Sequence, residues 1–153
     1  MKNNILIKII EEDALFIIDN LKTKPATGSL IMVTGASGLI GTYLLAVLSH
    51  IRKLKLSKFK VIAIVQSPPS KILKSFINKG DKIIRCDLAD HNSVKSLPKA
   101  DLIIHAAGYA QPNKFLKNPI KTILLNTDAT FQLIQKLNFL QRSISVHQQP
   151  NSL

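Results

Sequence analysis

Short runs of apolar, mostly β-branched residues alternate along the chain with segments whose apolar residues recur every three or four positions. The short runs cover residues 30–34, 60–65, 82–86 and 101–105. The helical spacing covers residues 39–49, 71–78 and a longer stretch after Pro119. Strands that alternate with helices of about ten residues form right-handed βαβ units around a parallel sheet. The pattern therefore predicts an α/β fold with four parallel strands.

The residues before the first strand have a helical pattern of their own. Leu6, Ile10, Ile17 and Leu21 recur near helical spacing, and the stretch 23–29 then interrupts the pattern as a loop. We expect three parts: a helical extension over 1–28, the α/β domain over 29–141, and a divergent or frameshifted tail over 142–153.

Length and composition agree with one cytoplasmic domain. The chain has 153 residues, of which 46% are hydrophobic, enough to bury a core. No apolar run approaches the roughly 20 residues needed to cross a bilayer. The single cysteine, Cys86, permits no internal disulfide and no cysteine-based metal cluster, which fits a reducing compartment. We therefore expect a cytoplasmic protein without membrane contact.

The net charge of +12 raises the alternative of a nucleic-acid-binding protein. No acidic residue lies between Asn20 and Gly80, and five basic residues crowd the stretch 52–60. However, the chain contains no tryptophan, and Phe59 is the one aromatic residue within the basic run, whereas a base-stacking surface requires several. A solvated basic face is the favoured interpretation, and we expect no nucleic-acid partner.

The strongest motif is the glycine loop that follows the first strand, Thr34-Gly35-Ala36-Ser37-Gly38-Leu39-Ile40-Gly41. Gly35 lets the chain leave the strand in a tight turn, and Gly38 lets the backbone approach a pyrophosphate. Gly41 lets the following helix pack closely on the strand. A glycine motif alone also occurs in plain turns, but here it follows a strand and opens an amphipathic helix, as phosphate binding requires.

The start of that helix supplies the donors for a phosphate group. Its first N–H groups have no intrahelical partner, and its dipole is positive at this end. Backbone groups at Leu39 and Ile40 belong to this first turn, and Ser37 and Thr34 offer hydroxyl donors. We therefore predict a phosphate site made of Gly35, Ser37, Gly38, Leu39, Ile40 and Gly41.

With this loop spacing the chain resembles the extended branch of the short-chain dehydrogenase/reductase superfamily, the NAD(P)-dependent epimerases and dehydratases that act on nucleotide sugars. Further landmarks follow in order. Asp87-Leu88 matches the family position beside the adenine amino group. The turn Ala106-Ala107-Gly108 matches the small residues beside the riboses. Asn126 matches the asparagine that holds the neighbouring strand and helps order the active-site water.

The resemblance implies a Rossmann-type doubly wound parallel sheet that binds a dinucleotide, and it covers residues 30–140. Residues 109–112, with Phe115 and Pro119, look like family members that work on UDP- or dTDP-sugars for surface polysaccharides. Gln66 occupies the position where an acid selects NAD or an arginine selects NADP. Because Gln66 carries no charge, while Lys71 and Lys74 lie nearby, NAD is only modestly favoured over NADP.

Several of these residues also have plainer interpretations. Asp87 could be a residue at a helix N-terminus with no ligand. His105 closes an apolar strand and is expected to be a core histidine without a proton-transfer role. Cys86 is expected to be an inert buried thiol. Asn126 could simply bond to the backbone.

The catalytic pair of this family, Tyr-x-x-x-Lys, is missing from the sequence. Tyr43 is followed four residues later by Val47, and Tyr109 by Asn113. In the family the lysine lowers the pKa of the tyrosine, which accepts a proton as hydride leaves. We assign no catalytic and no metal-binding residue, and we expect a sheet truncated after the fourth or fifth strand, with only remnants such as Ser143 and Ser145 beyond it.

Three functional hypotheses follow. The favoured one is the dinucleotide-binding half of a nucleotide-sugar epimerase or dehydratase, with a nucleotide sugar as partner only in a full-length form. The others are a non-catalytic NAD(P)-sensing module and a nucleic-acid-binding protein that uses the stretch 52–60. We also expect the apolar edge of the fourth strand to promote dimerisation or aggregation.

Overall fold

The structure is a computed structural model and describes residues 2–108 and 116–138. Its centre is a parallel sheet whose described strands are β1 (Leu30–Thr34), β2 (Lys60–Val65), β3 (Lys82–Arg85) and β4 (Leu102–His105). The strand order is β3-β2-β1-β4, with Ile31 paired to Val61 on one side and to Leu102 on the other. The predicted Rossmann-type arrangement is thereby confirmed, and each strand begins within one residue of its predicted start.

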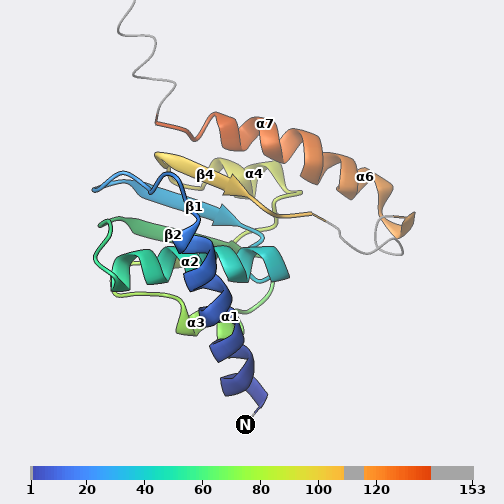
Figure 1. The fold of residues 1–153 in the computed structure, drawn as a ribbon. Coiled ribbons are helices and arrows are strands. Elements are labelled where there is room, and N and C mark those ends of the chain that lie inside the picture. Colours follow the sequence, from blue (N-terminus) through green and yellow to red (C-terminus); the bar gives the residue numbers. More distant parts are fainter. Residues whose placement is uncertain (1, 109–115, 139–153) are drawn as a thin grey trace, which may run out of the picture.

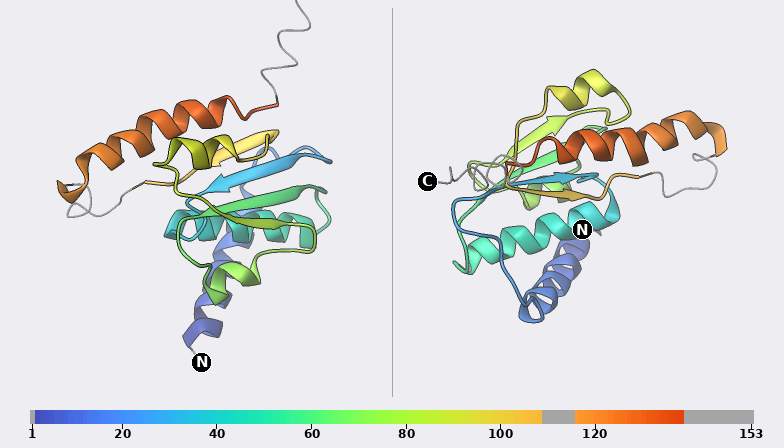
Figure 2. Two further views of the ribbon diagram at one scale, coloured as in Figure 1. Left: turned by 180° about the vertical axis from the view of Figure 1, so that it is seen from behind. Right: turned by 90° about the horizontal axis from the view of Figure 1, so that it is seen from above.

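Helices cover both faces of the sheet (Figure 2). One face packs Ile31, Val33 and Val61 against the helices that precede and follow β1, and the other packs Met32 and Ile62 against the helices that flank β4. Successive strand residues thus enter opposite cores, which explains why the strands are apolar throughout instead of alternating with polar residues.

Three helices connect the strands (Figure 1). The first, α2 (Leu39–Lys53), runs one turn beyond its predicted end. The second, α3 (Lys71–Ser75), is shorter than predicted, and the side chain of Ser70 caps it by accepting a hydrogen bond from Leu73 N at 3.1 Å. The third, α4 (His91–Lys95), was not predicted, because its five residues are too few to establish a helical period.

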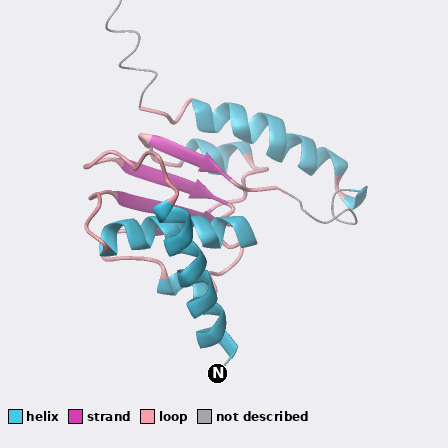
Figure 3. Ribbon diagram, in the orientation of Figure 1, coloured by secondary structure: helices cyan, strands magenta, loops and turns pink. Residues whose placement is uncertain are grey.

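The long stretch after Pro119 is one helical segment with a change of winding in its middle (Figure 3). It consists of α6 (Pro119–Ile123), the π-helix η1 (Leu124–Asp128) and α7 (Ala129–Ile134). A π-helical turn inside an α-helix is rare and often marks a functional site. Here it occurs where the segment passes the carboxyl end of β4.

The N-terminal segment forms α1 (Lys2–Asp19), which packs against α2. The helix predicted before the first strand is therefore present. Ile10, Ala14 and Ile18 are buried, whereas Leu6 and Ile17 are 44% and 39% exposed. Apolar residues lie around most of the circumference of α1, so the helical spacing predicts the helix but does not define its buried face. No helix in the described ranges is both long and apolar enough to cross a membrane.

A buried ion pair ties the end of α2 to the start of β3. Arg52 donates to both carboxylate oxygens of Asp81, at 2.6 and 2.9 Å, and the Asp81 side chain is 1% exposed. The same carboxylate accepts hydrogen bonds from Val61 N and Asn78 N. Asp81 therefore joins a helix end, a strand and a loop through four charge-assisted bonds.

Replacing Asp81 should destabilise the fold strongly. Asp81→Asn leaves the buried guanidinium of Arg52 without a counter-charge, and we expect the free energy of unfolding to fall by about 3 kcal/mol. Urea titration followed by circular dichroism measures this change. The control is Asp19→Asn at the exposed end of α1, which should shift the free energy by less than about 0.5 kcal/mol. Equal effects of the two substitutions would contradict a stabilising role for the ion pair.

Candidate functional site

A pocket of about 290 Å³ opens where the carboxyl ends of the four strands meet. Ligands of open α/β sheets bind at this edge, beside the point where the strand order reverses, which here lies between β1 and β4. The loops after all four strands contribute to its wall. Its lining consists of Gly35, Ser37, Gly38, Ile64, Val65, Gln66, Cys86, Asp87, Leu88, Ala89, Ala106, Ala107, Gly108 and Leu125.

Two glycines of the loop after β1 are required by the fold itself. Gly35 has a φ of +64°, and a Cβ atom there would lie 2.6 Å from the carbonyl oxygen of Ala106. A Cβ atom on Gly41 would lie 2.7 Å from Cα of Ala36 and would also collide with the carbonyl group of Gly35. These contacts bring the start of α2 directly against the ends of β1 and β4.

Gly38 is different, because the fold barely requires a glycine there. Its φ of −75° and ψ of 172° suit any residue, and a Cβ atom at this position would have Gly35 O as its nearest neighbour, at 3.2 Å. Gly38 lines the pocket and is the N-cap residue of α2, to which it offers no capping side chain. A side chain at this position would therefore occupy space in front of uncapped helical N–H groups.

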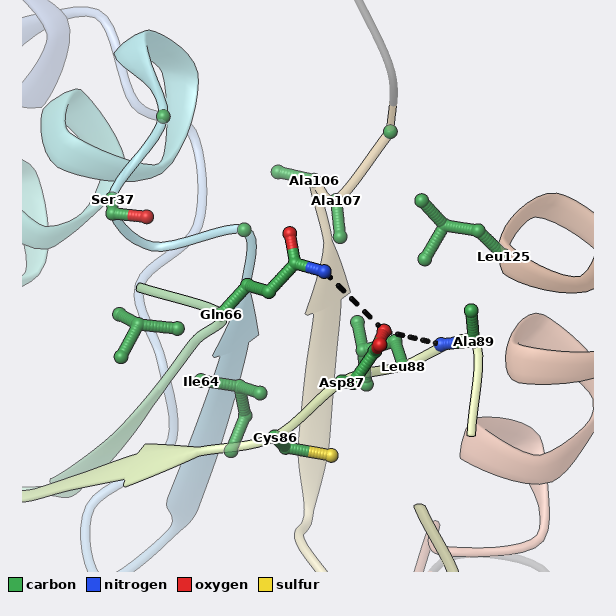
Figure 4. A pocket seen from close by; sticks show the side chains of 14 residues that line it. Ser37, Ile64, Gln66, Cys86, Asp87, Leu88, Ala89, Ala106, Ala107 and Leu125 are labelled. Atoms are coloured by element: carbon green, nitrogen blue, oxygen red, sulfur yellow. Dashed lines mark hydrogen bonds between the residues drawn. The ribbon is translucent and has the colours of Figure 1, made fainter. Parts of the chain in front are cut away.

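Gln66 and Asp87 face each other across the pocket (Figure 4). Gln66 Nε2 donates to Asp87 Oδ1 at 3.4 Å, and Ala89 N donates to the same oxygen at 3.1 Å. Among the described residues, no hydrogen bond engages the second carboxylate oxygen of Asp87. This oxygen can accept a hydrogen bond from a ligand in the pocket.

The alternative interpretation of Asp87 as a helix N-terminal residue is wrong. The N-cap of α4 is Asp90, whose side chain accepts a hydrogen bond from Asn92 N. Hydrogen bonds from Ser93 and Asn92 hold the pKa of Asp90 below its usual value. Asp87 lies before this cap, in the loop after β3, and lines the pocket.

The wall beside β4 combines small residues with the π-helix. Ala106, Ala107 and Gly108 line it, together with Leu125 from η1. Asn126 is exposed, and its Oδ1 lies 4.0 Å from the position of a Cβ atom on Gly108. The structure thus places Asn126 beside the predicted turn, with no side-chain hydrogen bond to another described residue.

The hydroxyl group of Thr34 does not reach the pocket, contrary to our expectation. Thr34 is fully buried, and its Oγ1 is 2.6 Å from Nδ1 of His105 on the neighbouring strand. Burial lowers the pKa of His105, although a backbone group of Leu125 acts in the opposite direction. The imidazole is therefore neutral at pH 7 and links the ends of β1 and β4.

Cys86 reaches the pocket from the end of β3 but is chemically unreactive there. Burial, followed by the nearby charges of Asp87 and Asp90, raises the pKa of its thiol to about 11. The thiol stays protonated at neutral pH, so it is a poor nucleophile. No group of three or more possible metal ligands occurs within the described residues.

The structure brings most of the predicted site residues together. Those that line the pocket are Gly35, Ser37, Gly38, Gln66, Asp87, Leu88, Ala106, Ala107 and Gly108. Gly41 lies behind the loop, while the side chains of Leu39 and Ile40 are 77% and 67% exposed at the start of α2. Sequence reasoning missed Ile64, Val65, Ala89 and Leu125 as lining residues, and assigned Cys86 only a buried position. All of these residues except Leu125 lie at or just after the end of a strand, and this position in the sequence could have identified them as lining residues.

Two other predictions concern residues 109–115 together with the C-terminal tail, and the basic stretch 52–60. Residues 109–112 and Phe115 of the polysaccharide-related set, and the tail with Ser143 and Ser145, lie outside the described residues, whereas Pro119 of that set begins α6. Within the basic stretch 52–60, Arg52 pairs with Asp81, and Lys53 lies 3.3 Å from Glu11. Part of the charge of this stretch is therefore neutralised inside the chain.

The pocket suits an elongated ligand with chemically different ends. The glycine loop and the start of α2 favour an anionic group, because helix N-termini attract negative charge. The opposite side offers one carboxylate, Asp87, between apolar walls formed by Ile64, Leu88 and Leu125. This combination can hold a flat ring that donates a hydrogen bond.

Comparisons with known proteins agree with this geometry. The model of the NAD dependent epimerase/dehydratase family matches residues 31–145. Among solved structures, an epimerase from Methanothermobacter thermautotrophicus is 20% identical, with a TM-score of 0.53 over 72% of this chain and 32% of its own. The enzyme WbmF from Bordetella bronchiseptica, in complex with NAD+, is 18% identical, with a TM-score of 0.51 over 72% and 32%.

A UDP-N-acetylglucosamine 4-epimerase from Methanobrevibacter ruminantium is 23% identical, with a TM-score of 0.50 over 72% of this chain and 34% of its own. At these identities the likeness concerns the fold. The chain spans about a third of the length of these structures. A search of curated proteins gave no match.

The two kinds of glycine in the loop should respond differently to alanine. Gly41→Ala forces α2 away from β1, and we expect it to lower the free energy of unfolding by about 2 kcal/mol or more. Gly38→Ala meets only Gly35 O and should cost less than about 1 kcal/mol. Urea titrations of both variants measure the difference. A larger loss for Gly38→Ala would contradict the roles assigned to the two positions.

Proposed function

Because the chain belongs to the NAD dependent epimerase/dehydratase family, we propose that the pocket at the ends of its strands binds NAD. The observation that carries this proposal is the uncapped start of α2 behind Gly38, where the fold leaves room that a side chain would fill. The pyrophosphate lies there, held by backbone N–H groups of residues 39–41 and by the hydroxyl group of Ser37, while Gly38 N donates to Gly35 O at 2.9 Å and closes the turn.

The adenosine end of the dinucleotide lies over β2 and β3. The free carboxylate oxygen of Asp87 accepts a hydrogen bond from the adenine amino group, and Leu88 packs against the ring. Ala106, Ala107 and Gly108 leave space for the riboses beside β4, and Asn126 lies next to this turn. Leu125 lines the side of the pocket opposite Ser37 (Figure 4).

Gln66 favours NAD over NADP in this arrangement. Its amide group lies at the end of β2, within hydrogen-bond distance of Asp87. A neutral amide can bond to the ribose hydroxyl groups of NAD, but it supplies no charge to balance the 2′-phosphate of NADP. The nearby carboxylate of Asp87 further disfavours that phosphate.

We assign these 153 residues binding of the dinucleotide and no hydride transfer. Neither tyrosine of the sequence has the lysine four positions later that activates it in the family. Tyr43 donates its hydroxyl hydrogen to Asp13 at 2.9 Å, and this bond raises its pKa above the usual value. Epimerisation or dehydration of a UDP- or dTDP-sugar belongs to a polypeptide that also supplies the Tyr-x-x-x-Lys pair.

Removing the space at Gly38 tests the binding site. Gly38→Asp places a carboxylate against the pyrophosphate, and we expect the affinity for NAD to fall by about 100-fold or more, which corresponds to about 2.7 kcal/mol. Isothermal titration calorimetry measures the affinity, and circular dichroism checks that the fold persists. Ser75→Asp, at an exposed position of α3, is the matched control and should bind like the unmodified chain. Unchanged binding by Gly38→Asp would refute this location for the phosphates.

The choice of cofactor is tested at Gln66. Gln66→Arg introduces a guanidinium group that binds a phosphate through two parallel hydrogen bonds. We expect the ratio of NADP to NAD affinity to rise by about tenfold, measured by competition titrations. Gln66→Glu should change the ratio in the opposite direction, because it adds a negative charge. If neither variant alters the ratio, residue 66 does not face the adenosine ribose.

A further inference from the structure

Helix α1 carries a row of apolar side chains that nothing in the described chain covers. Ile5, Ile9 and Phe16 follow helical spacing and are 62%, 46% and 72% exposed. The opposite side of the same helix carries Ile10 and Ala14, which are buried against α2. The helix thus has two apolar faces, and only one of them packs within the chain.

This helix is separate from the dinucleotide site. The family match begins at residue 31, after α1 has ended. Figure 1 shows α1 on the outer side of α2, with its N-terminal end directed away from the sheet. An association through the exposed row would therefore leave the pocket open.

The charges beside the row are arranged for pairing with an identical helix. Lys8 and Glu12 lie on one flank of the row, 3.8 Å apart, and their side chains are 78% and 65% exposed. The midpoint between Lys8 and Glu12 falls at Ile10, and the midpoint between Ile5 and Phe16 falls beside it. A two-fold axis perpendicular to the helix at this level relates it to an antiparallel copy. The rotation reverses the direction of the helix but keeps the Lys8/Glu12 flank of both copies on the same side of the pair.

We propose that α1 pairs in antiparallel orientation with α1 of a second copy of this chain. Phe16 then packs against Ile5 and Ile9 of the second copy, and the symmetry repeats this contact at the other end. On the flank, Lys8 lies opposite Glu12 of the second copy. The same two-fold rotation therefore buries the apolar row and places opposite charges beside it. Flanking charges of this kind set the orientation of paired helices.

The charge of the helix argues against a membrane surface as the occupant. Residues 2–19 contain two basic and four acidic residues, so α1 is negative within a chain of net charge +12. Amphipathic helices that bind anionic lipid carry basic residues on their polar face. The single helix pair is smaller than the interfaces of permanent dimers, so the dimer is reversible and forms at high protein concentration.

Sedimentation equilibrium of the full chain over a range of concentrations measures this association. We expect a monomer–dimer equilibrium that Phe16→Glu shifts at least tenfold toward monomer. The comparison variant is Ile120→Glu, at a position on α6 that is 73% exposed, and it should leave the equilibrium unchanged. A chain that is monomeric throughout, or that loses its dimer through Ile120→Glu and not through Phe16→Glu, would overturn the proposal.

A charge exchange distinguishes this helix pair from association through β4 or any other surface. Lys8→Glu alone and Glu12→Lys alone each place like charges opposite one another, and both should dimerise more weakly than the unmodified chain. Mixing the two variants restores opposite charges across the interface, so we expect a heterodimer that exceeds either homodimer. The double variant Lys8→Glu/Glu12→Lys should recover the original dimer. If the mixture associates no better than its components, α1 does not pair in this register.

Discussion

The close approach of α2 to the ends of β1 and β4 is the constraint on which the rest of the site depends. Gly35 and Gly41 lack the atoms that would hold these elements apart, since a Cβ at either position would collide with backbone atoms. The approach points the start of α2 at the edge of the sheet where the strand order reverses. Gly38 lies at the tip of the same loop, where a missing side chain serves the pocket and not the packing. The three glycines of the motif therefore have two different roles: Gly35 and Gly41 allow close packing, and Gly38 leaves space in the pocket.

The far end of α2 is held as firmly as its start. Arg52, in the last turn, reaches Asp81 before β3, and the carboxylate is saturated by further bonds from Val61 and Asn78. Because the helix is fixed at both ends, its N-terminal groups keep one position relative to the strand ends. Such rigid support is what a site needs when backbone groups, and not adjustable side chains, hold the ligand.

How far the sequence predicted this structure depended on how much local information each element carries. Strands buried on both faces appear as continuous apolar runs, so their starts were predicted within one residue. The glycine loop was equally clear, because its spacing reflects contacts within one strand–helix unit. The buried face of α1 and the pairing of Thr34 with His105 were not predictable, since both depend on residues distant in sequence. Leu125 and the π-helix were not predicted either, because the helical spacing after Pro119 gives no sign of a local change in winding.

The chemistry of the pocket follows from where its titratable groups are placed. His105 lies at the end of β4 with its Nδ1 bonded to Thr34, and burial lowers the pKa of its imidazole, which favours the neutral form. The thiol of Cys86 is held protonated by burial, and the hydroxyl group of Tyr43 is bonded to Asp13 on the outer side of α2. Asp87 is the one carboxylate in the pocket lining, and it faces the amide of Gln66, at the end where a base would be recognised. Within the described residues, the thiol of Cys86 and the imidazole of His105 are thus held in their neutral forms, and Asp87 and Gln66 offer the hydrogen-bonding groups that orient a ligand. If this surface holds the dinucleotide as we propose, the proton acceptor for hydride transfer comes from residues other than those that line the pocket.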